Sequence, residues 1–309
     1  MSKNILIYTH MGKFLYHDGG TVAQYYLASI LDELGQNVRI YNSTGIFIQN
    51  PIFNKFYNNG NDFPIDDNTV VIYCEGTQGN PLNVKNAVRW MLSELGKNVP
   101  YHFVNTWGKD ELVYYFNSET KFETYSSNFG NIYKLLTCVY INPDIRQTNF
   151  IQRDEYCHTF RKQHWHTNGI QYCHPDNSFE ITRSHNQSQC IEFFNRYKYF
   201  ISYDPCTFLT IIAALCGCIS IVYPIHGLNK QQWIQTTAAN EYVKSKGLDN
   251  LYGIAYGLDD LQYACDTIHL VKEQWDDIQK FCKEKTIVPF INDIQNFENM
   301  QNTLQNNYF

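Results

Sequence analysis

The stretch 199–224 has residue types and spacing that suit phosphate binding. It predicts a short apolar strand over Tyr199–Ser202, a turn at Asp204-Pro205, a helix over 207–215 and a β-branched strand over 218–223. A strand that turns directly into a helix leaves unpaired backbone N–H groups and the positive end of a helix dipole at one edge of a sheet. Open α/β sheets bind phosphate at this edge. The stretch is therefore the first candidate site.

A second unit of this kind lies near the N-terminus. The pattern predicts a buried strand over Asn4–Thr9, the pair Gly19-Gly20, an apolar-periodic helix over 21–34 ended by Gly35, and a strand over 38–41. The spacing is not the GxGxxG dinucleotide fingerprint. The glycine pair indicates either close approach to a ligand at the strand end or a simple tight turn.

Cysteine and histidine side chains gather in the middle of the chain. Their spacings fit no standard zinc framework, so we expect no structural zinc. One or two of the histidines remain candidates for ligand contact. The six residues are Cys157, His158, His164, His166, Cys173 and His174.

Composition narrows the class of protein. A formal net charge of −6 over 309 residues argues against a nucleic-acid partner but leaves small phosphorylated ligands open. No signal-peptide pattern and no apolar run of about 18–20 residues is present, so we expect a cytoplasmic protein without a transmembrane segment. The ten cysteines are scattered, which indicates reduced thiols. The Asn, Ile, Tyr and Lys bias is typical of an AT-rich genome or a large DNA virus and carries no functional weight.

The remaining elements alternate in both halves of the chain. Predicted strands cover Thr69–Cys74, 101–105, 134–141, 156–160 and 251–256, and predicted helices cover 82–95, 188–196, 231–246 and 258–271, with a helical tail interrupted at Pro289. Two successive βα series predict an α/β fold with two Rossmann-like domains, over 1–145 and 146–288, followed by a tail over 289–309.

Four stretches in this order resemble nucleotide-sugar glycosyltransferases of the GT-B type, specifically the family 4-like enzymes. They are GGTVAQYYLASILDELG at 19–35, GNPLNVKNAVRWML at 79–92, SYDPCTFLTIIAALCGCISIVYP at 202–224 and YGIAYGLDD at 252–260. The resemblance implies two Rossmann-like domains facing across a cleft, with the donor bound mainly by the C-terminal domain and the acceptor mainly by the N-terminal one. It also implies that the C-terminal tail crosses back to the first domain.

The resemblance implies a hexosyltransferase. Its donor would be a UDP-, dTDP- or GDP-sugar, and its acceptor would be a hydroxyl of a glycan or a related molecule. No obligatory metal is expected, because Asp66-Asp67, the early acidic pair, precedes its strand instead of following it. Fixed cations and a helix dipole would neutralise the phosphates instead.

The resemblance also implies which residues of this chain contact the donor. Arg161 and Lys162 follow the first strand of the second domain, where the resembling enzymes place cations against the diphosphate. Asp204 takes the first position of an acidic pair spaced eight apart, but Ile212 stands at the second. Asp204 could instead cap its helix. The expected donor-binding set is Gly19, Gly20, Arg161, Lys162, Tyr203, Asp204, Cys206, Thr207, Phe208 and Lys230.

The catalytic candidates belong to the first domain. Glu75 ends a predicted buried strand, where a carboxylate of raised pKa could deprotonate an acceptor hydroxyl. Alternatively, Glu75 has a purely structural role and caps the loop 76–80. His10 and His17 compete for the role of base, and Asp18 could orient either of them. The expected catalytic set is Glu75, His17 and Asp18.

Two other functions remain open. A nucleotide-sugar epimerase shares the expected architecture, but it needs paired acid and base groups that the sequence does not reveal. A catalytically inactive partner subunit that binds sugar nucleotide is the second alternative. The apolar Ile212 at an expected acidic position keeps it open.

Overall fold

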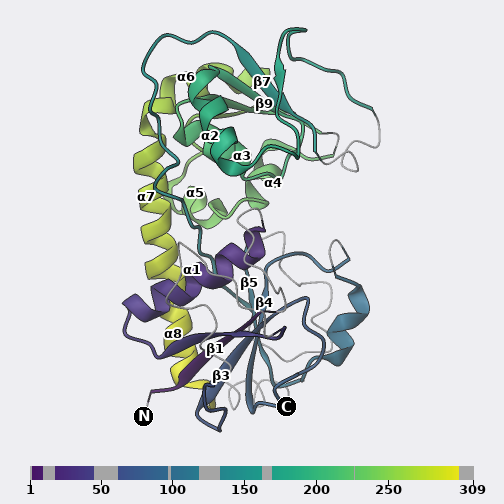
Figure 1. Ribbon diagram of the computed structural model, residues 1–309, viewed down its shortest axis with the longest axis vertical. Coiled ribbons are helices and arrows are strands. Elements are labelled where there is room, and N and C mark those ends of the chain that lie inside the picture. The colour runs from purple at the N-terminus through teal and green to yellow at the C-terminus, as the bar shows by residue number, and fades with distance from the viewer. Residues whose placement is uncertain are drawn as a thin grey trace. The chain divides into compact units, whose positions relative to one another are not determined.

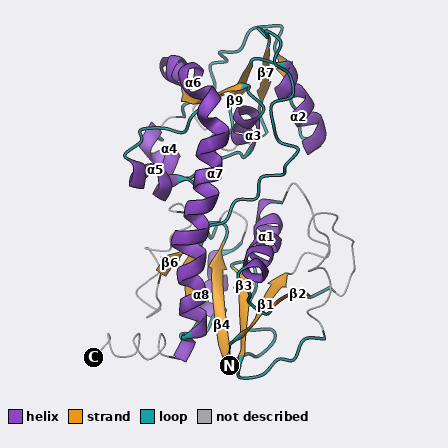
Figure 2. Ribbon diagram, turned by 90° about the vertical axis from the view of Figure 1, so that its left-hand side faces the viewer, coloured by secondary structure: helices purple, strands orange, loops and turns teal. Residues whose placement is uncertain are grey.

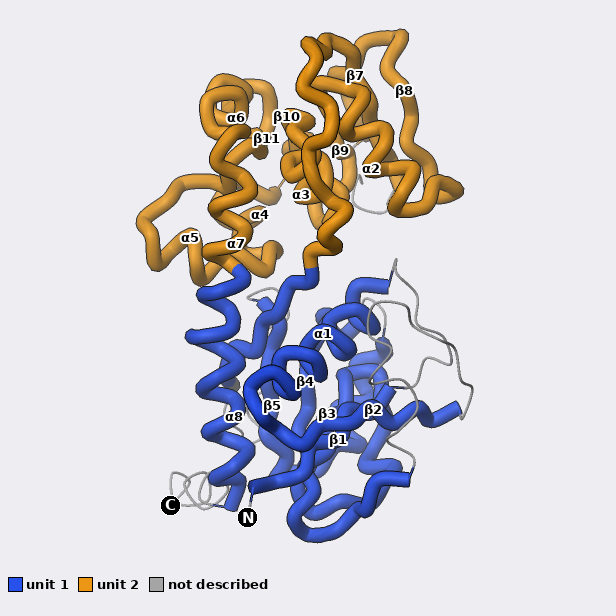
Figure 3. Tube along the Cα trace, turned by 60° about the vertical axis from the view of Figure 1, so that its left-hand side comes forward, with its two compact units in different colours: residues 1–140, 279–309 blue, residues 141–278 orange. Residues whose placement is uncertain are grey.

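The computed structural model describes residues 2–9, 18–44, 62–96, 99–117, 133–161, 169–225 and 227–298 (Figure 1). The chain forms two compact units, one of residues 1–140 with 279–309 and the other of residues 141–278 (Figure 3). Each unit is built on a parallel sheet. The predicted α/β fold with two Rossmann-like units is therefore confirmed, and the cleft between them stays a prediction.

Unit 1 contains a six-stranded sheet in the order β2-β1-β3-β4-β5-β6. Every neighbouring pair is parallel. The central strands are buried on both faces, which explains why they are rich in Val and Ile. The strands are β1 (Asn4–Thr9), β2 (Val38–Asn42), β3 (Thr69–Cys74), β4 (Asn86–Met91), β5 (Leu112–Tyr115) and β6 (Tyr133–Leu135).

Helices α1 (Gly19–Glu33) and α8 (Val288–Gln295) pack on the same apolar core of this sheet (Figure 2). Leu27 and Leu31 of α1 and Phe290 of α8 are fully buried there. Because the chain re-enters unit 1 at Gln279, its last described helix completes the core of its first unit.

Unit 2 contains a five-stranded parallel sheet in the order β11-β10-β9-β7-β8. Its strands are β7 (Tyr156–Thr159), β8 (Phe179–Glu180), β9 (Tyr199–Ser202), β10 (Ile219–Val222) and β11 (Ile254–Tyr256). The helices are α2 (Gln187–Arg196), α3 (Leu209–Leu215), α4 (Lys230–Gln235), α5 (Asn240–Lys246), α6 (Leu261–Thr267) and α7 (Val271–Cys282), which continues into unit 1 from Gln279 on.

The two sheets share one topological feature. In each, the first strand along the chain lies between the second and the third: β1 lies between β2 and β3, and β7 lies between β8 and β9. The connections that leave the first and third strands therefore run in opposite directions, and the carboxyl ends of these two strands form a topological switch point. Ligands of open α/β sheets bind at this switch point.

Several predicted elements are wrong. The predicted helix over 82–95 is strand β4, and the predicted strand over 101–105 is a 3₁₀ helix, η1 (Tyr101–Thr106). The predicted helix over 231–246 divides into α4 and α5. The predicted interruption of the helical tail at Pro289 does not occur. A π-helical segment (Lys283–Ile287) leads directly into α8. Such a segment accommodates the missing proline N–H within a continuing helix.

No helix within the described part of the chain is both long enough and apolar enough to cross a bilayer.

Candidate functional site

Glu75 lies at the switch point of unit 1, directly after β3. Its side chain is buried, with 7% of the residue exposed, and its Oε2 accepts a hydrogen bond from the Leu92 N–H at 2.9 Å. Burial raises the pKa of Glu75 to about 7, an effect that the backbone N–H groups led by Leu92 oppose and the nearby Asp18 carboxylate reinforces. At neutral pH this carboxyl group therefore exists in both protonation states.

The N-terminus of α1 lies beside this carboxyl group. Asp18 caps the helix: its Oδ1 accepts the Gly20 N–H at 3.1 Å and its Oδ2 accepts the Thr21 hydroxyl at 2.8 Å. A Cβ on Gly20 would lie 3.7 Å from the Leu92 side chain, so the residue that donates to Glu75 also packs on the first turn of α1. Gly19 and Gly20 belong to this turn and not to a loop before it.

The raised pKa of Glu75 suits this carboxyl group to proton transfer. A carboxylate whose pKa is near 7 can take a proton from a hydroxyl during a reaction and release it afterwards. Asp18 and Glu75 make the surroundings negative, which suits a neutral acceptor better than a diphosphate. His10 and His17 lie outside the described residues.

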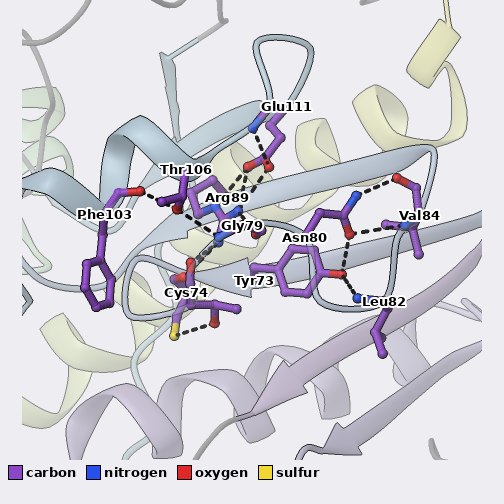
Figure 4. A network of polar contacts seen from close by, with 12 residues as sticks. Tyr73, Cys74, Gly79, Asn80, Leu82, Val84, Arg89, Phe103, Thr106 and Glu111 are labelled. Carbon is purple, nitrogen blue, oxygen red and sulfur yellow. Dashed lines mark hydrogen bonds and ion pairs between the residues drawn. The ribbon is translucent and has the colours of Figure 1, made fainter.

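A buried ion pair holds the loop after β3 (Figure 4). Arg89 of β4 pairs with Glu111 through two hydrogen bonds, from Nε at 2.9 Å and from Nη2 at 3.0 Å. The same guanidinium donates to the carbonyls of Cys74, Thr77 and Gly79. Burial raises the pKa of Glu111, and the Arg89 charge opposes that rise.

The switch point of unit 2 carries Asp204, which is fully buried. Both of its carboxylate oxygens accept the backbone N–H of Arg161, at 3.1 and 3.0 Å. Asp204 thus joins the carboxyl ends of β7 and β9. It does not cap α3, because that helix begins at Leu209 and its N-cap is Phe208. The predicted start of this helix at 207 is two residues early.

Arg161 lies two residues beyond the end of β7. Its guanidinium donates to the Thr182 carbonyl at 2.6 Å and approaches the Cys190 sulfur at 3.9 Å. Arg183 is an exposed residue that the sequence analysis missed, and its guanidinium donates to the Arg161 carbonyl. The sequence does not indicate this residue as a site candidate, because β8, the strand that precedes it, is only two residues long. Lys162 lies outside the described residues.

The turn between Asp204 and α3 is fixed from both sides. Trp233 of α4 donates from its indole to the Pro205 carbonyl at 2.8 Å. The Thr207 hydroxyl accepts the Leu209 N–H at 3.4 Å, and Cys206 and Thr207 are partly exposed. Ile212 is 3% exposed and belongs to the buried face of α3, so an acid at this position would be buried in the core.

Two other expected donor contacts have partners within unit 2. Lys230, the first residue of α4, forms an ion pair with Asp260 at 3.0 Å, close to the carboxyl end of β11. Tyr203 is fully buried. Its hydroxyl accepts the Cys173 N–H at 2.9 Å and lies 2.8 Å from His174 Nδ1.

The histidines of the Cys/His cluster interact with each other. His158 and His174 stack face to face with ring centroids 3.7 Å apart. Burial, together with a smaller effect of the neighbouring His174, lowers the pKa of His158 to about 4, so the His158 ring is neutral at pH 7. Within the described ranges no three His, Cys, Asp or Glu side chains are placed to hold a metal ion. His164 and His166 lie outside those ranges.

Comparisons with known proteins give likenesses to solved structures. No protein-family model matches the chain, and no curated protein sequence matches it. Among solved structures the chain is similar to the one described as T4 phage BGT in complex with its UDP-glucose substrate. The identity is 9%, the match covers 98% of this chain and 99% of that chain, and the TM-score is 0.42.

Proposed function

We propose that this protein is a glycosyltransferase that moves a hexose-type sugar from a nucleotide-diphosphate sugar to an acceptor hydroxyl. The observation that carries the proposal is Glu75, a buried carboxyl group with its pKa raised to about 7 at the switch point of unit 1. Strongly shifted carboxyl groups at sheet edges are characteristic of catalytic sites.

In the proposed reaction Glu75 is the general base. Its carboxylate accepts the acceptor's hydroxyl proton while that oxygen forms a bond to the anomeric carbon of the donor. The bond between the anomeric carbon and the diphosphate oxygen breaks, and its electron pair leaves with the nucleoside diphosphate. Burial keeps the pKa of Glu75 high, and the negative charge of Asp18 adds to this effect. Proton transfer to a base positioned in this way typically accelerates a reaction by about 10²–10⁴-fold.

Unit 2 provides the proposed donor side. At the switch point between β7 and β9, Arg161 donates its backbone N–H to the buried Asp204, and the Arg183 guanidinium donates to the Arg161 carbonyl. Because charge develops on the departing diphosphate, fixed guanidinium groups there would stabilise the transition state more than the bound donor. The partly exposed turn at Cys206 and Thr207 would supply backbone N–H groups. Lys162, Lys230, Tyr203, Gly19 and Gly20 stay predictions as donor contacts.

A non-catalytic sugar-nucleotide binder is the second candidate. It is favoured by Ile212, which is buried where the resembling enzymes carry an acid. It is also favoured by the Arg161 guanidinium, which donates to Thr182 inside the unit. Such a protein would bind donor without turning it over.

Two measurements test the proposal. Thermal unfolding is followed with UDP-glucose, dTDP-glucose and GDP-mannose; a donor at 100 times its Kd stabilises the protein by about 2.7 kcal/mol. If none of the three raises the Tm, the donor assignment is wrong.

Release of nucleoside diphosphate is then measured with and without methyl hexosides. Release that increases with added hexoside identifies a transferase, whereas a raised Tm without release identifies a silent binder.

Arg183→Met is expected to weaken binding of the donor that raises the Tm by about tenfold, the equivalent of one charge-assisted hydrogen bond. The reason is that Arg183 is exposed at the unit 2 switch point, where the diphosphate would lie. Isothermal titration calorimetry measures the affinity. Arg196→Met is the matched control, since Arg196 is an exposed arginine of unit 2 at the end of α2. Equal affinities in the two variants would move the phosphate site elsewhere.

A further inference from the structure

Arg89 is an unusual residue for the middle of a sheet. It is fully buried in β4, a strand whose six residues are all buried. Its five N–H donors all have acceptors: Nε and Nη2 donate to Glu111, Nη2 also donates to Gly79, and Nη1 donates to Cys74 and Thr77. A guanidinium is the side chain whose donor geometry can satisfy so many acceptors at once.

The three carbonyls that Arg89 binds bracket the proposed base. One belongs to Cys74, immediately before Glu75, and two belong to Thr77 and Gly79, shortly after it. Gly79 is in a left-handed conformation, with φ of 59°, and its N–H donates to the Thr106 hydroxyl at 2.8 Å. The backbone on both sides of Glu75 is thus fixed to one guanidinium, as Figure 4 shows for Cys74 and Gly79.

Strand β4 also holds the Glu75 side chain. The Leu92 N–H, which donates to Glu75 Oε2, follows the last residue of β4. Arg89 and Leu92 lie three residues apart along the chain, so one segment fixes the loop backbone and the carboxylate together. Glu111 completes the arrangement, because it holds Arg89 in place and accepts the Gly108 N–H at 2.9 Å.

Stability alone does not account for this ion pair. Replacing a buried ion pair by apolar residues of similar volume is often neutral or stabilising, because burying two charges costs desolvation energy. The guanidinium lies over the rings of Tyr73 and Trp107, at 5.1 and 4.7 Å. An apolar side chain would pack in the same place. What an apolar pair cannot replace is the set of bonds to the Glu75 loop.

We infer that Arg89 and Glu111 are positioning residues that hold Glu75 buried beside Leu92 in the conformation needed of a general base. The inference rests on the proposed function, because it names the device that prepares its base. Arg89 acts through the loop and does not touch the reacting atoms.

The test uses the double variant Arg89→Met/Glu111→Leu, which removes both charges and keeps an apolar core. The titration of Glu75 is followed by NMR of its ¹³C-labelled side-chain carboxyl group, assigned by comparison with Glu75→Gln. In the wild type the midpoint is expected near 7. In the double variant the loop admits water, so the midpoint is expected to fall by about one pH unit or more toward the ordinary value of 4.5. An unchanged midpoint in the folded double variant overturns the inference.

Arg89→Lys is the second variant, in case the double variant does not fold. It keeps the charge opposite Glu111, but an ammonium has three donors where the guanidinium has five, so at least two of the five hydrogen bonds are lost. The Glu75 midpoint is expected to fall here too, and an unchanged midpoint again contradicts the inference. Tyr114→Phe is the control, since it removes a buried hydrogen bond to Asp293 in the same unit and should leave the midpoint unchanged.

The titration separates this inference from the proposed function. If the wild-type protein transfers no sugar but the midpoint shifts as expected, the positioning role holds and the function fails. If the wild type transfers sugar and the variants keep both the midpoint and the turnover, the function holds and the positioning role fails.

Discussion

Glu75→Gln is expected to lower turnover by about 10²–10⁴-fold while donor affinity stays within about twofold of the wild type. The amide has nearly the same shape as the carboxylate, but it cannot accept the hydroxyl proton. Donor affinity stays close to that of the wild type because Glu75 is not among the proposed donor contacts. Initial rates at saturating donor and calorimetric affinities measure the two quantities. Full activity of Glu75→Gln would remove Glu75 as the base.

The same variant should change the pH dependence of stability. The folded-state pKa of Glu75, about 7, lies above the ordinary value of 4.5. Folding therefore favours the protonated form, and the stability linked to it is fully present below pH 4.5 and lost as the pH rises through about 7. Above that pH the buried charge costs the wild type on the order of 3 kcal/mol, a cost that glutamine does not have. Urea unfolding should find Glu75→Gln more stable than the wild type at pH 8 and about equal at pH 4.

Glu33→Gln is the matched control for both experiments. Glu33 ends α1 and pairs with Lys283 on the surface, where its side chain is mostly exposed. An exposed pair of this kind contributes about 0–1 kcal/mol. The control should therefore keep wild-type turnover and should not gain stability at pH 8. If it reproduces the gain, the effect is one of net charge and not of a buried carboxylate.

Arg89→Met alone is expected to destabilise the protein by about 3–5 kcal/mol. The substitution leaves Glu111 buried with its charge unpaired and leaves three loop carbonyls without their donor. Equilibrium unfolding in urea at pH 7 measures the loss. Arg89→Met/Glu111→Leu should recover most of it, since the double variant contains no unpaired charge. A loss below about 1 kcal/mol in the single variant would show that water reaches Glu111 and that the pair is not buried in solution.

Local patterns predicted the strands that define both sheets. Asn4–Thr9, Thr69–Cys74 and Tyr199–Ser202 have the predicted bounds, because short β-branched runs buried on both faces are typical of parallel sheets. The apolar period of the residues 21–34 predicted helix α1, which begins two residues earlier, at Gly19. These elements are predictable because runs and periods of apolar residues in the sequence indicate which short segments are buried.

The predicted helix over 82–95 failed for a long-range reason. Arg89, a charged residue in the run NAVRWML, is buried against Glu111, which is 22 residues away. No local pattern indicates such a partner. Asn80 suggests a helix start, yet its side chain bonds the Tyr73 hydroxyl at 2.7 Å and the Val84 N–H at 3.1 Å, which forms a turn between two strands.

The candidate site was predictable in its position and not in its electrostatics. A carboxylate that follows a buried strand could be located at Glu75 from the pattern alone. Its pKa depends on Leu92 and Asp18, which other segments bring to it. In unit 2 the sequence indicated Arg161 and Asp204, but the bond between them joins two strands 43 residues apart. Arg183 follows a strand too short to be recognised.

The pH dependence of sugar transfer tests the central claim most directly. Release of nucleoside diphosphate from the stabilising donor is measured between pH 5 and 9, with added methyl hexoside, for the wild type and for Glu75→Gln. Because the base must be ionised, the wild-type kcat/KM should rise with pH through a midpoint near 7, and the variant should stay low throughout. A wild-type rate that is flat over this range, or equal rates for the two proteins, would contradict the account.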